Sequence, residues 1–308
     1  MKILILGHSS LVKRKIIPSL HKIDKIEDVE IASLSDKNIP GVSKMYSNYE
    51  NALETTDAQI VYISLPNSLH FKYLKKSIEQ NKNVIVDKPF LINLREYAEI
   101  QELLETSNSF VFESNVFTFH SGWKKFKELA LMNSDKGSLV ANFSIPALES
   151  GNFRNFKKMG GGAFNDMGPY AASVGLKFWE SDAKNIYINK RIENGLISSF
   201  SVEANYGENK NLVGKFSFNE SYSNYLAFES KEIFLYLMPA FSSPENMDVK
   251  ILGLKNNETF EIQIKTDNTF KNFIEESIKT IEENEFLKSR NSLYNSVDEF
   301  FAFKQVLK

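Results

Sequence analysis

The segment at residues 59–90, QIVYISLPNSLHFKYLKKSIEQNKNVIVDKPF, decides the fold. It contains two continuous apolar runs, at 59–65 and 83–87, which are typical of strands buried on both faces. Between them, apolar side chains recur at helical spacing over residues 68–81. A strand, a helix and a strand in this order predict two parallel strands joined by a right-handed crossover.

The same alternation extends through the first part of the chain. Strand-like runs also lie at 2–7, 29–34 and 109–114, and segments with helical spacing lie at 10–22, 48–56 and 92–107. This pattern predicts the α/β class, with a doubly wound parallel sheet at the N-terminus.

The pattern changes after about residue 120. Helical segments are expected at 121–132 and 163–179, and residues 184–265 contain strand-like segments separated by the turn signals ENG, YGENKN and LKNNE. The tail at 267–307 predicts two helices. We therefore expect two domains, 1–119 and 120–308, the second an α+β domain with a large, mainly antiparallel sheet.

Composition excludes several classes of protein. The 308 residues are 42% hydrophobic and 25% charged, as in ordinary globular proteins, and no cysteine is present for disulfides, thiolate metal sites or a nucleophile. The four histidines show no metal-ligand spacing, so no metal site is expected. A net charge of −2 without a basic block argues against nucleic acid, and the first apolar run is too short for a signal or a membrane span. A cytoplasmic location is expected.

The first strand-to-helix turn is GHSSLVKRKIIP, residues 7–18. A dinucleotide-binding turn usually has three glycines, or two and an alanine, in the spacing G-x-G-x-x-G. Here Gly7 is retained, while Ser9 and Val12 occupy the other two places. Ser9 and Ser10 are able either to cap the helix or to donate to a phosphate, and the turn alone leaves both interpretations open.

Four motifs together resemble the glucose-fructose oxidoreductase/inositol dehydrogenase (Gfo/Idh/MocA) family of nicotinamide-dependent oxidoreductases. They are Gly7, Ser9, Arg14 and Pro18 in the first turn and helix; Pro66, Asn67 and His70; Asp87, Lys88 and Pro89; and GGGAFNDMGPY at 160–170, preceded by Arg154. The segment VFESNVFTFH at 111–120 is similar to the family's connection between domains. Asp87 stands where the family usually has a longer glutamate.

The resemblance implies an N-terminal Rossmann domain that binds a nicotinamide dinucleotide. It places the cofactor-binding residues at Gly7, His8, Ser9, Ser10, Leu11, Ser33, Leu34, Leu65, Pro66, Asn67, His70, Asp87, Lys88 and Pro89. Ser33 stands where an NAD enzyme often has an acid for the ribose, which favours NADP(H), as do the nearby Ser35 and Lys37. Against this, Leu34 replaces a common arginine and Asp36 would repel a 2′-phosphate, so NAD(H) remains an alternative.

The resemblance also implies a catalytic group of Lys88, Tyr170 and Asp166, with Lys88 followed by a peptide bond to proline that is often cis. Asp166 and Tyr170 share one face of a helix that begins nearby, and Pro169 is expected in its first turn. Tyr170 would be the proton donor. The alternatives are that Asp166 caps the helix and that Tyr170 only packs between domains.

Substrate contacts are expected from Lys88, His120, Arg154, Asp166 and Tyr170. The Tyr-containing helix start is most similar to relatives that reduce a keto group at ring position 3 of a nucleotide-linked deoxysugar. Arg154, Lys157 and Lys158 would then bind a diphosphate, although a solvated basic loop explains them equally well. Thr118 and Asn165 depart from the residues common in such relatives.

Two other functions remain open from the sequence. One is a dehydrogenase of a free sugar, cyclitol or dihydrodiol, and the other is a catalytically silent relative that binds a cofactor or a sugar. In each case the resemblance implies that the second domain carries an open-faced sheet and that the protein is a homodimer or homotetramer formed through it. The expected partner is a small-molecule sugar or sugar nucleotide, with no membrane and no nucleic acid.

Overall fold

The computed structural model describes residues 1–35 and 38–307. The chain forms two compact units, one of residues 1–114 with 270–294 and one of residues 115–269 with 295–308. The predicted boundary at 119/120 stays a prediction, and it differs from this division in grouping residues 270–294 with the second part.

The first unit contains a six-stranded sheet in the order β3-β2-β1-β4-β5-β6, in which all neighbouring pairs are parallel. The strands are β1 (Lys2–Leu6), β2 (Asp28–Ala32), β3 (Lys44–Tyr46), β4 (Ile60–Ile63), β5 (Asn83–Asp87) and β6 (Val111–Ser114). This is the doubly wound order of dinucleotide-binding folds, so the predicted α/β class is confirmed. The short strand β3 was not predicted.

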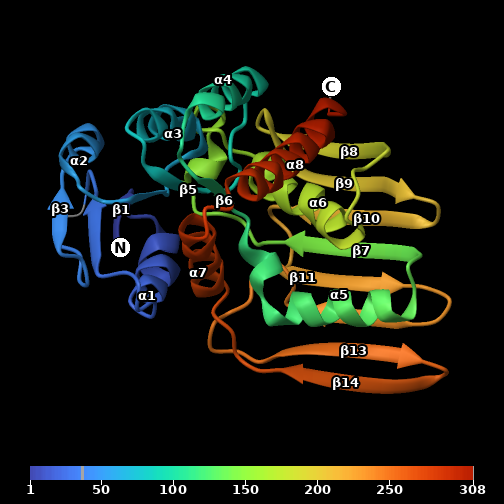
Figure 1. The fold of residues 1–308 in the computed structure, drawn as a ribbon. Helices are drawn as coiled ribbons and strands as arrows, with labels where there is room; N and C mark the ends of the chain where they lie inside the picture. Colours follow the sequence, from blue (N-terminus) through green and yellow to red (C-terminus); the bar gives the residue numbers. More distant parts are fainter. Residues whose placement is uncertain (36–37, 308) are drawn as a thin grey trace. The chain divides into compact units, whose positions relative to one another are not determined.

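Helices connect these strands as the apolar spacing predicted (Figure 1). They are η1 (Val12–Ile16, a π-helical turn), α1 (Ile17–Leu20), α2 (Tyr49–Thr55), η2 (Asn67–Leu69), α3 (His70–Glu79) and α4 (Leu94–Thr106). Asn48 and Asn93 cap α2 and α4 through their side-chain oxygens. Helices α7 (Thr269–Glu282) and α8 (Phe286–Gln305) form the tail.

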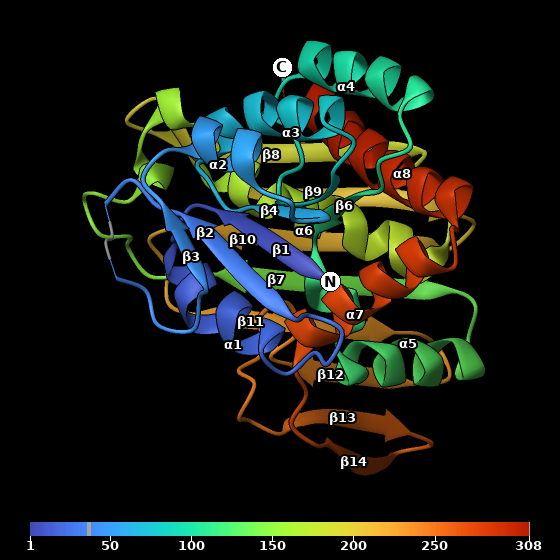
Figure 2. The ribbon, with the colours of Figure 1, turned by 60° about the vertical axis from the view of Figure 1, so that its left-hand side comes forward.

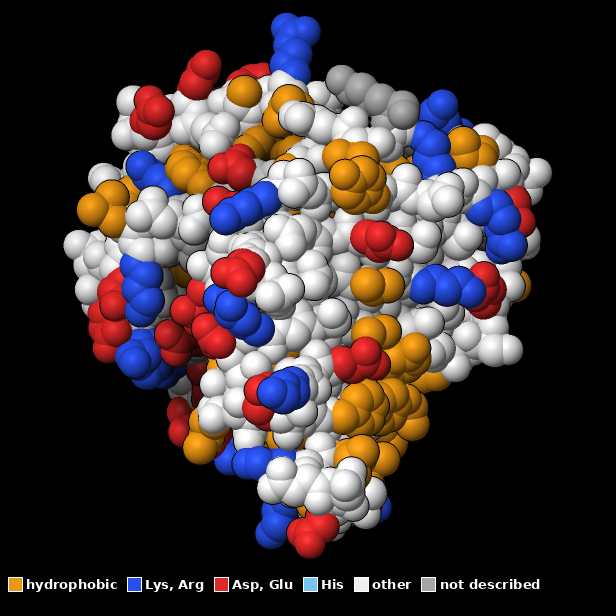
Figure 3. Space-filling view, turned by 90° about the vertical axis from the view of Figure 1, so that its right-hand side faces the viewer, with side chains coloured by type: hydrophobic (Ala, Val, Ile, Leu, Met, Phe, Trp, Pro, Cys, Tyr) orange, Lys and Arg blue, Asp and Glu red, His pale blue; other side chains and the backbone are white. Residues whose placement is uncertain are grey.

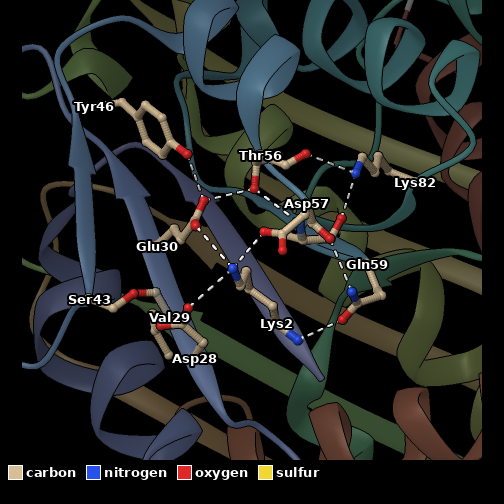
Figure 4. Close-up of polar contacts among 11 residues, drawn as sticks. Lys2, Asp28, Val29, Glu30, Ser43, Tyr46, Thr56, Asp57, Gln59 and Lys82 are labelled. Carbon is tan, nitrogen blue, oxygen red and sulfur yellow. Dashed lines mark hydrogen bonds and ion pairs between the residues drawn. The ribbon is translucent and has the colours of Figure 1, made fainter.

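A polar network holds the amino ends of the parallel strands (Figure 4). The buried Glu30 carboxylate accepts hydrogen bonds from Tyr46 Oη at 2.9 Å and Thr56 Oγ1 at 2.8 Å, and Lys2 Nζ lies 3.5 Å from it. Lys2 Nζ also pairs with Asp57 at 2.5 Å. Because the amino edge is closed by these internal contacts, the carboxyl edge is where a ligand is expected in this fold.

The second unit contains an eight-stranded sheet in the order β14-β13-β12-β11-β7-β10-β9-β8. The strands are β7 (Gly137–Ser144), β8 (Asn185–Glu193), β9 (Leu196–Gly207), β10 (Lys210–Ser217), β11 (Ser223–Glu229), β12 (Phe234–Met238), β13 (Val249–Lys255) and β14 (Glu258–Ile264). Strands β7 and β10 are parallel and the other neighbouring pairs are antiparallel. The mainly antiparallel sheet is confirmed, although β7 lies outside the predicted region.

Helices α5 (Ser121–Asn133) and α6 (Ala163–Trp179) pack on this sheet, α5 on β12 and β13 and α6 mainly on β9 and β10 (Figure 2). Strand β9 alternates accordingly: Phe200 and Val202 are buried, whereas Ser201 and Glu203 are exposed. Short 3-10 turns η3 (Val116–Phe119), η4 (Phe153–Asn155) and η5 (Lys157–Met159) complete the unit. Among the described residues no helix is both long and apolar enough to span a membrane.

Candidate functional site

The turn after β1 requires glycine at residue 7. Gly7 has a φ of +97°, and a Cβ on it would lie 2.3 Å from the carbonyl oxygen of Ser64. Ser9 Oγ accepts a hydrogen bond from Val12 N at 3.2 Å and lies 2.8 Å from Ser64 Oγ. Ser9 therefore caps the first helix, as one of the two interpretations expected, and it also links the turn to β4. Its contact with a phosphate stays a prediction, as do the roles of His8, Ser10 and Leu11.

Asp87 is the centre of a chain of hydrogen bonds across the carboxyl ends of the strands. Its Oδ2 accepts from Ser64 Oγ at 2.6 Å and its Oδ1 from Tyr62 Oη at 2.9 Å. Tyr62 Oη also lies 3.0 Å from Ser114 Oγ. Through Ser64 and Ser9, this chain connects β1, β4, β5 and β6. The shorter aspartate therefore has two hydroxyl partners from β4 and its end, and Ser114 of β6 joins the chain through Tyr62.

The electrostatics of Asp87 reflect opposing effects. Burial raises the pKa of Asp87, while hydrogen bonds from Ser64 and Tyr62 and the charges of His70 and Lys88 act in the opposite direction. Burial and the negative charge of Asp87 raise the pKa of Tyr62. Tyr62 is therefore a hydrogen-bond donor to Asp87 and not an acid that ionises near neutral pH.

Hydrogen bonds hold the loop after β5 at the two residues that follow Lys88. The peptide bond between Lys88 and Pro89 is cis. The fully buried His70 ring places Nδ1 2.9 Å from the carbonyl oxygen of Pro89 and Nε2 2.9 Å from that of Leu65. Phe90 N donates to Glu113 Oε1 at 2.7 Å. The backbone that follows Lys88 is thus held by His70 of α3 and Glu113 of β6.

The residues expected to select the cofactor follow β2. Ser33 is buried, and its N–H donates to the carbonyl oxygen of Tyr46 at 2.9 Å, whereas the Leu34 side chain is 66% exposed. Asp36 and Lys37, which entered the sequence argument about NADP(H), lie outside the described residues.

In the second unit, the triple glycine forms a tight loop before α6. A Cβ on Gly161 would lie 2.3 Å from the carbonyl oxygen of Arg154, which accepts a hydrogen bond from Gly162 N at 2.9 Å. Asn165 Nδ2 donates to the carbonyl oxygens of Gly160 and Gly161 at 3.1 and 3.2 Å. The asparagine that departs from similar proteins therefore stabilises this loop.

The position expected for Pro169 is wrong. Helix α6 begins at Ala163, so Pro169 lies in its interior and not in its first turn. The reason is that the glycine loop ends at Gly162, four residues before Asp166, and the helix starts directly after it. Gly162 is the N-cap residue, so Asp166 does not cap α6. Instead, Asp166 Oδ1 pairs with Arg154 Nε at 2.9 Å.

Tyr170 follows Asp166 by one helical turn and lies among aromatic rings. Its ring centroid is 5.9 Å from that of Phe117, 5.4 Å from that of Phe143 and 5.4 Å from that of Phe241. Edge and tilted contacts of this kind restrict the ring orientation. The phenol ring is partly exposed, so packing and a chemical role are compatible for this residue.

His120 is the N-cap residue of α5. Its Nδ1 accepts a hydrogen bond from Gly122 N at 2.9 Å, so Nδ1 carries no proton. Burial lowers the pKa of His120, although the charge of Asp267 acts in the opposite direction. Its buried Nε2 has no hydrogen-bond partner among the described residues. In the part of the chain that the structure describes, no group of three or more His, Asp or Glu could hold a metal ion.

Comparison with known protein families gives a match to the N-terminal part of the chain. Residues 1–114 match the Gfo/Idh/MocA family, described as "oxidoreductase family, NAD-binding Rossmann fold". The resemblance to the Gfo/Idh/MocA family that the motifs indicated is thereby confirmed.

Curated relatives match over part of their length. The dTDP-3,4-didehydro-2,6-dideoxy-alpha-D-glucose 3-reductase of Saccharopolyspora spinosa is 27% identical over 186 residues, 58% of this chain and 56% of that protein. The D-xylose 1-dehydrogenase (NADP(+)) 2 of Haloferax volcanii is 26% identical over 56% of each chain. The match spans little more than half the length of these two relatives.

Solved structures match over nearly the whole chain. The crystal structure of KijD10, a 3-ketoreductase from Actinomadura kijaniata in complex with NADP and TDP-benzene, has a TM-score of 0.86 and 18% identity and covers 97% of this chain and 94% of that chain. At this level of identity the likeness shows the fold. Both sheets of the present protein therefore occur in the fold of that solved structure.

Part of the predicted site is brought together within each unit. In the first unit Ser9 is linked to Asp87 through Ser64, and His70 contacts the backbone of Leu65 and Pro89. In the second unit Arg154 and Asp166 form a pair. Lys88 and Tyr170 belong to different units, and their pairing stays a prediction. Tyr62 and Ser64 were missed, although they break the apolar run of β4 at alternate positions, which indicates one shared face.

Proposed function

We propose that the protein is an NAD(P)-dependent oxidoreductase that transfers hydride between a nicotinamide cofactor and a keto or hydroxyl group of a sugar. The preferred reaction is reduction of the 3-keto group of a nucleotide-linked deoxysugar. The observation that carries the proposal is the carboxyl edge of the parallel sheet, where Lys88 follows a carboxylate hydrogen-bonded through Ser64 to the glycine turn. The family of residues 1–114 and the names of the reductase relatives support it.

The first turn fits a dinucleotide. Gly7 has no room for a Cβ, so the backbone stays compact where a pyrophosphate would approach it, and a helix begins directly after the turn. The strand order reverses between β1 and β4, which is where ligands bind in such sheets. We prefer NADP(H) because Ser33 and Leu34 provide no carboxylate for the ribose hydroxyls, and NAD(H) is the alternative.

Bound nicotinamide supplies or accepts the hydride, and the chain supplies charge and a proton. In the proposed arrangement, the Lys88 ammonium stabilises the negative charge that develops on the carbonyl oxygen. An ammonium about 4 Å away contributes on the order of 4 kcal/mol at an effective dielectric constant near 20. The Tyr170 phenol donates its Oη proton to that oxygen, and in the reverse direction it receives it. Asp166 holds Arg154 at the start of the same helix.

Substrate binding is assigned to groups of the second unit. The Arg154 side chain is 31% exposed while it pairs with Asp166, so it has a face open to solvent. With the exposed Lys157 and Lys158 it would meet a diphosphate. The buried Nε2 of His120 is a donor that a sugar hydroxyl would satisfy.

Two alternatives have their own support. A dehydrogenase of a free sugar, cyclitol or dihydrodiol is favoured by relatives such as the trans-1,2-dihydrobenzene-1,2-diol dehydrogenase of Xenopus tropicalis, 24% identical over 58% of this chain and 52% of that protein. A catalytically silent binding protein is favoured by Ser9, which replaces a glycine of the nucleotide turn.

A fluorescence titration with NADPH and with NADH tests the proposal first. We expect binding at micromolar protein, tighter for NADPH, followed by turnover in a panel of keto-sugar nucleotides. Turnover of free sugars without the nucleotide would favour the alternative function, a dehydrogenase of free sugars, over the preferred one. If neither cofactor binds, the protein is better described as a catalytically silent binding protein than as an enzyme.

We also propose that the protein forms a homodimer or homotetramer through the outer face of the eight-stranded sheet. The register aligns one row across this face: Tyr187, Glu203, Val213, Val140, Ala227, Tyr236, Leu252 and Glu261. Ala227 is buried, and the other members are exposed or half-exposed. Tyr187 is 70% exposed, Val213 46% and Leu252 45%. Figure 3 shows apolar side chains gathered in patches between charged ones on one face of the molecule. The apolar residues of this row suit a second copy of the same surface.

A further inference from the structure

His70 makes two contacts that constrain its protonation. The ring is fully buried, and its two nitrogens lie 2.9 Å from two different backbone carbonyl oxygens, those of Pro89 and Leu65. A carbonyl oxygen only accepts hydrogen bonds. A neutral imidazole carries one N–H and one lone pair, so it satisfies one such oxygen and points a lone pair at the other.

Only the doubly protonated ring donates to both oxygens. A lone pair facing a carbonyl at 2.9 Å would be repulsive, and it would leave a buried acceptor without a donor. His120 shows the opposite case, because its Nδ1 accepts from a backbone N–H at the same distance. The two buried histidines therefore face different backbone partners, two acceptors for His70 and a donor for His120.

A buried cation also requires a compensating charge. Asp87 interacts electrostatically with His70 and lies at the end of the adjacent strand β5, next to Lys88. On the same helix as His70, Lys72 and Lys76 pair with Glu50 and Lys75 with Glu99, and on β6 Glu113 accepts from Phe90 N. Asp87 is the carboxylate that interacts with the charge of the ring, and it interacts with Lys88 as well.

We infer that His70 is an imidazolium in the folded protein and that it acts as a positioning residue, tying the loop of Lys88 to the loop of Asn67. The ring joins Pro89, directly after Lys88, to Leu65, two residues before Asn67. Both loops end strands at the proposed cofactor edge. His70 thereby fixes the backbone from which Lys88 extends, and this consequence rests on the proposed function, whereas the protonation state does not.

Nitrogen NMR of the histidine rings tests the protonation state without any ligand. The chain has four histidines, so a long-range ¹H–¹⁵N spectrum of the labelled protein at pH 7.5 is readily assigned by substituting one at a time. We expect both nitrogens of His70 to show the protonated type of shift and two slowly exchanging N–H protons. His120 is the internal control, with one unprotonated nitrogen. An unprotonated nitrogen in His70 would overturn the inference.

The role of Asp87 is tested by Asp87→Asn in the same spectrum. Loss of the balancing carboxylate should convert His70 to a neutral ring at pH 7.5, while the signals of His120 stay unchanged. Retention of both protons on His70 would show that Asp87 does not balance it. Should this variant not fold, the wild-type spectrum still decides the protonation state.

The positioning role is tested by comparing His70→Phe with His70→Gln. Phenylalanine keeps a planar ring but donates to neither carbonyl, so turnover should fall by about tenfold or more, whereas glutamine donates from its amide and should restore part of it. His21→Phe is the matched control, because that ring contacts a single carbonyl, of Gly41, at the surface. Equal turnover of His70→Phe and wild type would remove the positioning role. If the wild type binds no cofactor, the proposed function fails while the NMR result stands.

Discussion

At the scale of single residues, Lys88 and Tyr170 have very different surroundings. Lys88 extends from a backbone fixed by His70 and Glu113, next to a carboxylate with two hydroxyl donors. Tyr170 is oriented by three phenylalanine rings on a helix whose start is fixed by glycines. Both groups are held by neighbours that do not depend on a ligand, which is the preorganisation that a proton donor and a charge stabiliser need.

We predict that Tyr170→Phe lowers turnover by about 10²- to 10⁴-fold while cofactor affinity changes by less than about threefold, because only the proton donor is lost. Lys88→Ala should lower turnover further, because it removes the charge at the developing oxyanion. Steady-state kinetics with the true substrate, together with NADPH titration, measure both. Tyr187→Phe, at an exposed position of β8, is the matched control. Wild-type turnover in Tyr170→Phe would exclude this residue from the mechanism.

Sequence motifs located the carboxyl-edge residues but not their partners. Asp87, Lys88 and Pro89 were placed by their order and spacing, whereas the hydroxyls of Tyr62 and Ser64 act only because β4 lies beside β5 in the sheet. His70 was expected to bind the cofactor, and its two carbonyl contacts depend on loops that meet in space. Pro169 was misplaced because the start of α6 is set by the glycine loop and not by the proline.

At the scale of elements, the strands that sequence patterns missed are those with weak local signals. Strand β3 has three residues and pairs at one edge of the sheet, so no run of apolar residues marks it. Strand β7 follows α5 closely, and its buried residues Leu139, Ala141 and Phe143 alternate with others that are half exposed. Its place between β10 and β11 comes from pairing across more than 60 residues, which local spacing does not reveal.

The network at the amino edge of the parallel sheet predicts a stability effect. Thr56→Val removes the hydroxyl that donates to buried Glu30 at 2.8 Å and accepts from Ala58 N at 3.0 Å, with almost no change in side-chain size. We expect the free energy of unfolding to fall by about 1–3 kcal/mol. Urea denaturation followed by circular dichroism measures it. Thr55→Val, at the exposed neighbouring position, should change it by less than about 0.5 kcal/mol, and equal effects of the two variants would contradict the prediction.

Helix α8 carries a buried carboxyl group with a strongly shifted pKa. Burial raises the pKa of Glu299 to about 7, and Asp182 adds to this, while the N–H of Ala183 and the phenol of Tyr206 act in the opposite direction. Ala183 N donates to Oε1 at 3.1 Å and connects the start of β8 to this helix. The folded protein therefore binds the Glu299 proton more tightly than the unfolded chain does, so this proton stabilises the fold at low pH.

Between pH 5 and pH 8 the stability that Glu299 contributes should accordingly decrease, by about 3 kcal/mol at most. Glu299→Gln keeps the acceptor for Ala183 N but does not titrate, so its free energy of unfolding should depend less on pH and exceed that of the wild type at pH 8. Urea titrations at several pH values, followed by the fluorescence of Trp123 and Trp179 in the same unit, measure this. Glu258→Gln on β14 is the exposed control. Parallel pH profiles for wild type and Glu299→Gln would refute the linkage.

At the scale of the whole molecule, the eight-stranded sheet has one face covered by α5 and α6 and a row of apolar side chains on the other. Leaving Val213, Tyr236 and Leu252 in contact with water forgoes the free energy that their burial would provide, about 25 cal/mol per Å². An edge strand of the sheet would offer a second copy only backbone hydrogen bonds. This row instead offers side chains that pack in a register fixed by the strand pairing. A second copy of the same face supplies the complementary surface under twofold symmetry.

We therefore predict that the 35.2 kDa chain is a dimer or tetramer by light scattering after gel filtration at about 10 µM, and that Val213→Lys combined with Leu252→Lys converts it to a monomer. Each lysine would face its symmetry-related copy in the interface, so repulsion and lost apolar burial act together. Leu287→Lys is the matched control, because Leu287 is 73% exposed but lies on α8. A wild-type monomer, or a double variant with unchanged mass, would mean that this row does not form the contact between copies.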